Sequence, residues 1–250
     1  TMPPKAYMFG MPYECYEQFH VRKYGFHGTS HRFVSMKYGE VTGKSLEGLN
    51  IVSCHLGNGS SITAIKDGKS VDTSMGFTPL DGIIMGTRSG SVDPSAVEFV
   101  QNKLGFTPAQ MSDYLNKKSG FLGLSGQFSD NRDITSAAQQ GDKRSQLVTD
   151  MLTYEIKKYI GSYTAAMNGL DVVIFTGGIG ENAPEVRKGV CENMEYLGIK
   201  LDNSVNDGLK GKLTKISAPD SKVEVWVIPT NEELLIARDT LEITGLDKNA

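Results

Sequence analysis

The sequence of 250 residues has little cysteine, a single tryptophan and no strong excess of charge of either sign. Its three cysteines, Cys15, Cys54 and Cys191, lie far apart and form no C-x-x-C pair. This spacing argues against a disulfide framework and against a zinc ribbon, and it is typical of a reducing, cytoplasmic compartment. The net charge of -3 argues against nucleic acid as the main partner, because nucleic-acid-binding domains carry a basic surface.

Long apolar runs are missing as well. One of the longest, "DVVIFTGG" from Asp171, is far shorter than the roughly 20 residues that cross a bilayer, and no signal-peptide pattern opens the chain. We therefore expect no membrane partner. Glycine is abundant by contrast, with 28 residues. These glycines gather in short clusters beside apolar segments. Backbones turn sharply or approach ligands closely at such places.

The periodicity of apolar residues predicts one continuous α/β domain without repeats. Residues 5–20 are expected to form one or two short helices broken at Pro12, and 29–38 a helix capped by Thr29 or Ser30. Residues 50–74 read as a three-stranded β-meander. Helices and strands then alternate: helices over 94–105, 107–120 and 142–169, a strand and glycine turn over 171–182, a helix over 184–198, two strands within 212–229 and a helix over 231–244. The residues expected to face the core from helix 142–169 are Leu147, Met151, Leu152, Ile156, Tyr159 and Ile160.

Two glycine turns follow apolar strands. In "HLGNGSS", residues 55–61, the glycines would expose consecutive backbone N–H groups that bind phosphate, although an ordinary Asn-Gly hairpin turn with positive φ has the same letters. "FTGGIGEN", residues 175–182, offers a second backbone surface, but its spacing matches neither the dinucleotide fingerprint nor a Walker P-loop. Two such turns fit a nucleotide, which needs one site for its phosphates and another for its base and sugar.

Three charged segments allow two interpretations each. Arg88 stands between Gly86 and Gly90, where it is either a surface arginine or a planar fork aimed at phosphate oxygens. "SDNRD", residues 129–133, is a helix N-cap or part of a site. "TNEE", residues 230–233, begins the last helix, where Glu232 favours the helix dipole; spacing alone does not establish it as a magnesium ligand.

The stretch "KYGFHGTSHRF", residues 23–33, holds two of the four histidines, His27 and His31, at a spacing of four. That spacing would place both rings on one helix face, as in zinc metalloproteases. No glutamate follows His27 and no third ligand lies nearby, so a zinc site is not supported. His27 is instead expected just outside a helix N-terminus, where an anion is favoured.

Taken in order, six blocks closely resemble the acetokinase family of short-chain acyl kinases: "YGFHGTSH", "HLGNGSSITAI", "GKSVDTSMGFTPLDGIIMGTRSGSVDP", "SGFLGLSG", "FTGGIGEN" and "IPTNEE". The resemblance implies the fold of the actin, hexokinase and chaperone-ATPase superfamily, which is ribonuclease H-like. It also implies a reversible, Mg²⁺-dependent transfer of a phosphoryl group from ATP to acetate, giving ADP and acetyl phosphate, in a cytoplasmic homodimer. Propionate and butyrate kinases share several blocks and remain alternatives.

The resemblance also implies roles for particular residues. His27 and Arg88 would contact the phosphoryl group in transfer, whereas His31 receives no catalytic role and is interpreted as structural. The family's phosphate hairpin falls on His55, Leu56, Gly57, Asn58 and Gly59. Its adenosine pocket falls on Asp130, Asn131, Arg132, Gly177, Gly178, Ile179, Gly180 and Glu181. Glu232 matches the family's magnesium-associated glutamate.

The resemblance covers only the C-terminal part of the family. Residues 1–250 are expected to form its nucleotide-binding domain, and an N-terminal domain of about 150 residues, an ordinary domain size, is absent. The family's catalytic aspartate, its carboxylate-binding arginine and an asparagine near the phosphates belong to that missing part. A non-catalytic nucleotide-dependent module of the same superfamily is the second hypothesis. Such a module has little use for His27 and Arg88 converging on a phosphoryl group, so these two residues favour the kinase.

Overall fold

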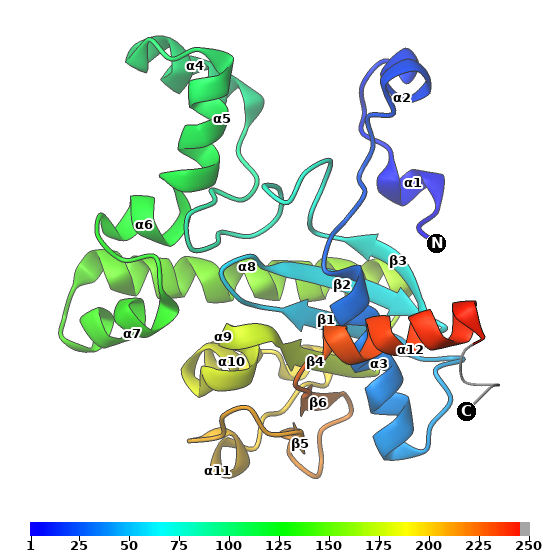
Figure 1. Ribbon diagram of the computed structural model, residues 1–250. Helices are drawn as coiled ribbons and strands as arrows, with labels where there is room; N and C mark the ends of the chain where they lie inside the picture. Colours follow the sequence, from blue (N-terminus) through cyan, green and yellow to red (C-terminus); the bar gives the residue numbers. More distant parts are fainter. Residues whose placement is uncertain (246–250) are drawn as a thin grey trace.

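A six-stranded mixed sheet forms the centre of the computed structural model, which describes residues 1–245 (Figure 1). The strand order is β3-β2-β1-β4-β6-β5. The bounds of the strands are β1 Asn50–His55, β2 Ser61–Lys66, β3 Lys69–Thr73, β4 Val172–Thr176, β5 Thr214–Lys215 and β6 Glu224–Val227.

The pairing of the strands brings the two predicted glycine turns to one edge. β1, β2 and β3 form an antiparallel meander, whereas β4 pairs parallel to β1 and β6 parallel to β4. His55 at the end of β1 is paired with Thr176 at the end of β4. Because carboxyl ends of parallel strands meet at one edge of a sheet, where ligands bind in α/β folds, the turns after His55 and after Thr176 are neighbours.

Alternating side chains of the strands pack into two cores, one on each face of the sheet. On one face Val52 and Phe175 pack with α8 and α10; on the other Ile51 and Ile174 pack with α3 and α12. Figure 1 shows the resulting three layers, with α8 on one side of the sheet and α3 and α12 on the other. α4 and α5 extend away from these layers, as do α1 and α2 elsewhere (Figure 1).

The helices have these bounds: α1 Pro4–Tyr7, α2 Tyr13–Phe19, α3 Gly28–Thr42, α4 Pro94–Leu104, α5 Pro108–Lys117, α6 Gly120–Ser125, α7 Asn131–Gln139, α8 Lys143–Met167, α9 Gly177–Asn182, α10 Pro184–Cys191, α11 Asn203–Asn206 and α12 Glu232–Thr244, with a 3₁₀ turn at Glu195–Leu197. The α/β class, the meander and the alternation that follows it are therefore confirmed. Within residues 1–245 no helix combines the length and the apolar character that crossing a membrane requires.

Three local predictions were wrong. The N-cap of α3 is His27, and neither Thr29 nor Ser30 caps the helix; the Ser30 hydroxyl lies inside the helix and is hydrogen-bonded to His55 instead. Leu147 on α8 is 49% exposed, because the buried side of that helix follows Val148 and its neighbours one turn apart. The turn after β4 is a short helix, α9, rather than a loop.

Candidate active site

The turn of the β1–β2 hairpin, residues 56–60, lies between two groups of side chains at the carboxyl edge of the sheet. Gly57 and Asn58 line a cavity of about 660 Å³. On the other side, a Cβ atom at Gly59 would lie 3.0 Å from Arg88 Nη1 and 3.5 Å from His27 Nε2. Gly57, Asn58 and Gly59 all lack a positive φ, so the expectation of a turn with positive φ was wrong. Gly59 is required by the close approach of Arg88 and not by its own backbone conformation.

The cavity of about 660 Å³ brings together segments that are far apart in the sequence. Five of the predicted adenosine residues line it together with the hairpin: Asp130, Asn131, Arg132, Gly178 and Ile179. Asp130 caps α7 by accepting from Arg132 N at 2.8 Å, and its other oxygen lies 2.6 Å from Arg132 Nη2. These bonds, first of all the one from the Arg132 side chain, lower the pKa of Asp130. Asp130 can therefore cap α7 and line the cavity at the same time.

The glycine turn after β4 is locked to the hairpin by its backbone. Ile179 N and Gly180 N both donate to Leu56 O, at 2.8 and 3.2 Å, and Gly177 N donates to Glu181 Oε1 at 2.9 Å. Three of the turn's four amide groups are thus used internally and are not free to bind phosphate. Gly177 has φ of +76°, and a Cβ there would lie 2.7 Å from Leu56 O, which explains the glycine.

Leu56, Gly177, Gly180 and Glu181 do not line the cavity. Glu181 Oε1 instead accepts from Thr230 N at 3.2 Å as well as from Gly177 N. This carboxylate therefore ties the glycine turn to the segment that leads into α12.

Glu232 is half-buried in the first turn of α12, two residues after Thr230. The Thr230 hydroxyl is buried and has no hydrogen-bond partner among residues 1–245. Residues 1–245 hold no group of three or more histidine, cysteine or acidic side chains that could bind a metal ion. A single carboxylate such as Glu232 is compatible with Mg²⁺, which in phosphate-transfer sites is commonly bound by one or two carboxylates and the phosphates of the substrate.

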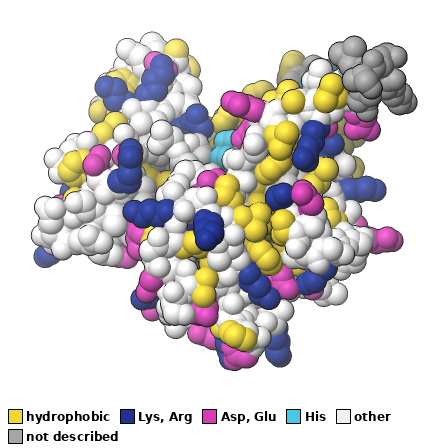
Figure 2. All heavy atoms as spheres, turned by 60° about the horizontal axis from the view of Figure 1, so that its bottom comes forward, with side chains coloured by type: hydrophobic (Ala, Val, Ile, Leu, Met, Phe, Trp, Pro, Cys, Tyr) yellow, Lys and Arg dark blue, Asp and Glu magenta, His cyan; other side chains and the backbone are white. Residues whose placement is uncertain are grey.

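His27 is held in an uncommon backbone conformation beside the hairpin. It has φ of 58° and ψ of 26°, the left-handed region, which is uncommon for a residue with a side chain and which often marks functional sites. Its ring stacks on that of His55, with centroids 4.0 Å apart, and its Nδ1 lies 2.9 Å from Ser61 Oγ. Figure 2 shows a histidine side chain in the hollow between two projecting parts of the surface.

The predicted pair of His27 and Arg88 is therefore brought together by the structure. The Arg88 loop is fixed by its backbone, because Met85 N donates to Arg88 O at 3.1 Å and Ser119 N donates to Thr87 O at 3.0 Å. Within the described residues 1–245, Arg88 Nη1 has only long contacts, with Pro79 O at 3.4 Å and Met85 Sδ at 3.8 Å. The guanidinium thus retains donors for an anion beside Gly59.

Burial and neighbouring charge keep the histidines neutral. Burial, with the Arg88 charge second, lowers the pKa of His27. Burial, with His27 second, lowers the pKa of His55 to about 4. Because desolvation disfavours the charged form, both rings act near neutral pH as hydrogen-bonding groups and not as cations. Arg88 provides the positive charge.

Several residues of this site were not found from the sequence. The cavity is also lined by Thr135, Asn182, Ala183, Pro184, Glu185 and Lys210. Asn182 could have been selected, because it ends the block "FTGGIGEN" and follows the glycines by one helical turn. Lys210 lies in a loop after α11 with no motif around it, so no pattern indicated it.

Known proteins resemble this chain over nearly its whole length. The model of the Acetokinase family matches residues 1–238. The acetate kinase of Carboxydothermus hydrogenoformans is 57% identical over 243 residues, which are 97% of this chain and 61% of that protein. The crystal structure of Porphyromonas gingivalis acetate kinase has a TM-score of 0.96 at 49% identity and is matched over 98% of this chain and 61% of that one.

A propionate kinase from Francisella tularensis has a TM-score of 0.88 at 41% identity, over 95% of this chain and 60% of that one. The chain thus spans about three fifths of the length of these relatives. Since the family model covers nearly all of the chain and more than half of the residues are identical to those of a full relative, the chain belongs to the acetokinase family.

Proposed function

We propose that this chain is the nucleotide-binding portion of an acetate kinase, which transfers a phosphoryl group reversibly between ATP and acetate and forms acetyl phosphate. The observation that carries the proposal is the position of the hairpin turn. Gly57 and Asn58 face a cavity large enough for a nucleoside, and Gly59 faces His27 and Arg88. A nucleotide in the cavity would therefore direct its terminal phosphate past the hairpin to these two side chains.

At that end the two side chains have separate tasks. Phosphoryl transfer depends mainly on positioning and on stabilising the charge of the transferred group. Arg88 offers a fixed charge with a planar fork, and neutral His27 offers one oriented hydrogen bond without adding a second positive charge beside Arg88. Both groups stand beside the hairpin turn, where oriented donors favour electrostatic stabilisation of the transition state.

At the other end the chain would hold adenosine. Gly178 leaves open space where a side chain would stand, so a flat base or a ribose can approach the backbone of α9. Asp130 and Arg132 border the same cavity from α7. ATP or ADP bound there would bring Mg²⁺ with its phosphates to neutralise charge at the transferred group, and Glu232 is the residue that would hold the ion.

The remaining parts of the proposal come from the resemblance to the family. Acetate is proposed as the acceptor because the relatives of 55–57% identity over this chain are named acetate kinase. Arg88 and His27 beside the hairpin favour the kinase over a non-catalytic module. We further propose a cytoplasmic homodimer for the full-length protein; three free cysteines, two of them buried, fit a reducing compartment.

We also propose that the acyl site is completed by the N-terminal domain. Residues 1–250 alone should then bind MgADP or MgATP weakly, because contacts in an open site are weakened by water. They should form no acetyl phosphate when assayed by trapping the product as a hydroxamate. Activity should return when the N-terminal part is supplied in cis or as a complementing fragment. Acetate phosphorylation by residues 1–250 alone would overturn this division of the enzyme.

A further inference from the structure

A continuous chain of hydrogen bonds runs behind His27, away from the hairpin. Ser53 Oγ lies 2.9 Å from His31 Nδ1, and His31 Nε2 lies 2.7 Å from Ser61 Oγ. Ser61 Oγ in turn lies 2.9 Å from His27 Nδ1. The series Ser53–His31–Ser61 is hidden from solvent, since both serines are 0% and His31 is 3% exposed.

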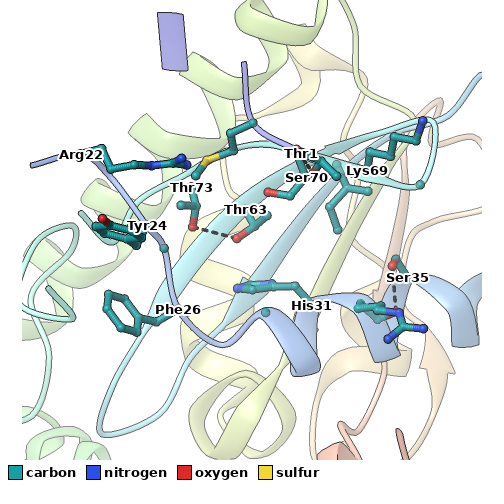
Figure 3. Close-up of a pocket in the computed structure, with 16 residues that line it drawn as sticks. Thr1, Arg22, Tyr24, Phe26, His31, Ser35, Thr63, Lys69, Ser70 and Thr73 are labelled. Atoms are coloured by element: carbon teal, nitrogen blue, oxygen red, sulfur yellow. Dashed lines mark hydrogen bonds between the residues drawn. The ribbon is translucent and has the colours of Figure 1, made fainter. Parts of the chain in front are cut away.

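Among residues 1–245, Ser53 and Ser61 are the hydrogen-bond partners of the two His31 ring nitrogens. Figure 3 shows its ring extending from α3 toward the strands, in the wall of a cavity of about 360 Å³. Both ring nitrogens are taken by serines. Burial, with the His55 and His27 charges next, holds the pKa of His31 well below its ordinary value. The ring is therefore neutral and carries one N–H.

Counting protons along this series leaves two directions in which Ser61 both donates and accepts, because an arrangement in which Ser61 accepts from both rings would leave its own buried proton without an acceptor. A neutral imidazole has one donor and one acceptor, and a serine hydroxyl has one proton to donate. In the first direction Ser53 donates to His31 Nδ1, His31 Nε2 donates to Ser61, and Ser61 donates to His27 Nδ1. The proton of His27 is then on Nε2. In the second direction every bond is reversed and the proton of His27 is on Nδ1.

The two directions differ at Ser53. His31 is the only hydrogen-bond partner of the Ser53 hydroxyl among residues 1–245. In the second direction His31 donates to Ser53, so the Ser53 proton has no acceptor in a fully buried position, which is costly. In the first direction every group of the series is satisfied.

We propose that Ser53, His31 and Ser61 are positioning residues that fix His27 in the tautomer with its proton on Nε2. That nitrogen is the one beside Gly59 and Arg88, so the series sets the hydrogen-bond donor that faces the hairpin. His31 therefore has a defined task and is more than a core histidine. The use of this donor on a phosphoryl group rests on the proposed function, whereas the tautomer itself does not.

His55 provides an internal control. Its Nδ1 lies 2.7 Å from Ser30 Oγ, and no other partner is found for the buried Ser30 hydroxyl within the described chain. Ser30 belongs to α3 and takes no part in the Ser53–His31–Ser61 series. The loss of Ser30 should thus alter the tautomer of His55 and leave that of His27 as it is.

The experiment is ¹⁵N NMR of the imidazoles in residues 1–250, labelled at histidine, with signals assigned through His27→Gln. In the wild-type chain we expect His27 with its proton on Nε2. In Ser61→Ala the ratio of the Nε2–H to the Nδ1–H form at His27 should fall by about tenfold, the effect of one lost hydrogen bond. Ser30→Ala should change His55 alone. Ser53→Ala, which leaves every contact of His27 in place, should mix the tautomers of His31 and His27 if Ser61→Ala fails to fold.

A wild-type His27 with its proton on Nδ1 would overturn the proposal, as would an unchanged His27 spectrum in both Ser61→Ala and Ser53→Ala. Kinetics of the full-length enzyme separate this result from the proposed function. Ser61→Ala should lower kcat with little change in the KM for ATP, whereas Ser30→Ala should have a smaller effect. If the tautomer is as expected and the full-length protein has no kinase activity, the proposed function fails and the positioning series stands.

Discussion

The two sides of the hairpin turn, one facing the histidines and the other facing the cavity of about 660 Å³, are built in opposite ways. On the histidine side, buried side chains hold each other through hydrogen bonds at fixed lengths, and Ser53 and Ser61 are fully hidden. On the cavity side, the lining combines backbone, buried residues such as Asn131 and Ala183, and exposed side chains, and the Arg132 side chain is 88% exposed in its pair with Asp130. The histidine side is thus built mainly from buried hydrogen bonds, and the cavity side is lined in part by exposed side chains.

This difference matches what each end has to do. A group that stabilises a transition state must be within a fraction of an ångström of its place, so prior order lowers the barrier. A nucleoside gains affinity from contact area with a surface, and exposed ion pairs add little to stability. We therefore expect changes on the histidine side to alter turnover and changes on the cavity side to alter affinity.

The largest effect is expected from Arg88→Ala in the full-length protein. Turnover should fall by about 10³-fold, as for other arginines that meet a transferred phosphoryl group, while the affinity for ATP stays within a few-fold. Arg88→Lys should restore little, because an ammonium group lacks the planar fork. Steady-state kinetics with ATP varied is the measurement. An unchanged kcat would remove Arg88 from the chemistry.

Removal of the buried Arg187 should come next, as a test of how the cavity side is supported. Its guanidinium is 0% exposed and donates to Gly180 O at 3.0 Å, Asn206 Oδ1 at 2.8 Å and Leu209 O at 2.9 Å. Arg187→Met would leave these buried oxygens unpaired and should cost about 3 kcal/mol, or about 10 °C in Tm.

The matched control for Arg187→Met is Lys188→Met, which changes an exposed neighbour on the same helix and should shift Tm by less than about 2 °C. Thermal unfolding followed by circular dichroism compares the two variants. Equal shifts would show that the turn after β4 does not depend on Arg187.

The buried histidines should also make the free energy of unfolding depend on pH. The pKa of His55 is about 4 in the folded chain, against about 6.5 when unfolded. As pH falls the unfolded chain takes up the proton first, so this contribution is complete above about pH 6.5 and is lost toward pH 4. Between pH 7.5 and pH 5 the loss should be about 2 kcal/mol. His27 and His31 add in the same direction.

Urea unfolding of the wild type and of His55→Gln at both pH values measures this contribution. The decline in unfolding free energy should be smaller in the variant by about 2 kcal/mol. An identical decline in both proteins would mean that the stacked pair of His27 and His55 is not desolvated in solution.

The smallest effect is expected from Gly178→Val, which acts on the cavity side alone. The new side chain has free space, with nothing within 4 Å of its Cβ, so the fold should tolerate it, but it would occupy the cavity. In the full-length protein the KM for ATP should rise by about tenfold with kcat nearly unchanged. Gly161→Val, at another glycine with open space on α8, is the control. A fall in kcat without a change in KM would contradict the division between the two ends.

The sequence predicted the fold well because its signals are local. Alternation over residues 50–74 and the apolar run before Gly177 were sufficient for the meander and for β4. Leu147 was predicted to face the core but is exposed, because the next residue, Val148, lies on the buried side of α8. The misplaced cap of α3 has another cause. Ser30 has the chemistry of an N-cap, but its hydroxyl is used by His55, 25 residues away.

Residues of the candidate site were predictable from the sequence only where they belong to a recognisable motif. His27, Arg88 and the hairpin were found through the resemblance, and the structure brings them together. The role of Gly177 and the amide bonds to Leu56 were not predictable, since they depend on how close two strands' ends lie after folding. For the same reason, His31 could only be interpreted as structural until Ser53 and Ser61 were seen on its two nitrogens.

The most direct test of the central claim is a calorimetric titration of residues 1–250 with MgADP, for the wild type, Arg88→Ala and Gly178→Val side by side. We expect one weak site in the wild type and the same affinity within a few-fold in Arg88→Ala. In Gly178→Val the binding should be at least about tenfold weaker. No binding to the folded wild-type chain, or equal losses in the two variants, would contradict a fixed phosphoryl end and a separate nucleotide cavity on the two sides of the hairpin.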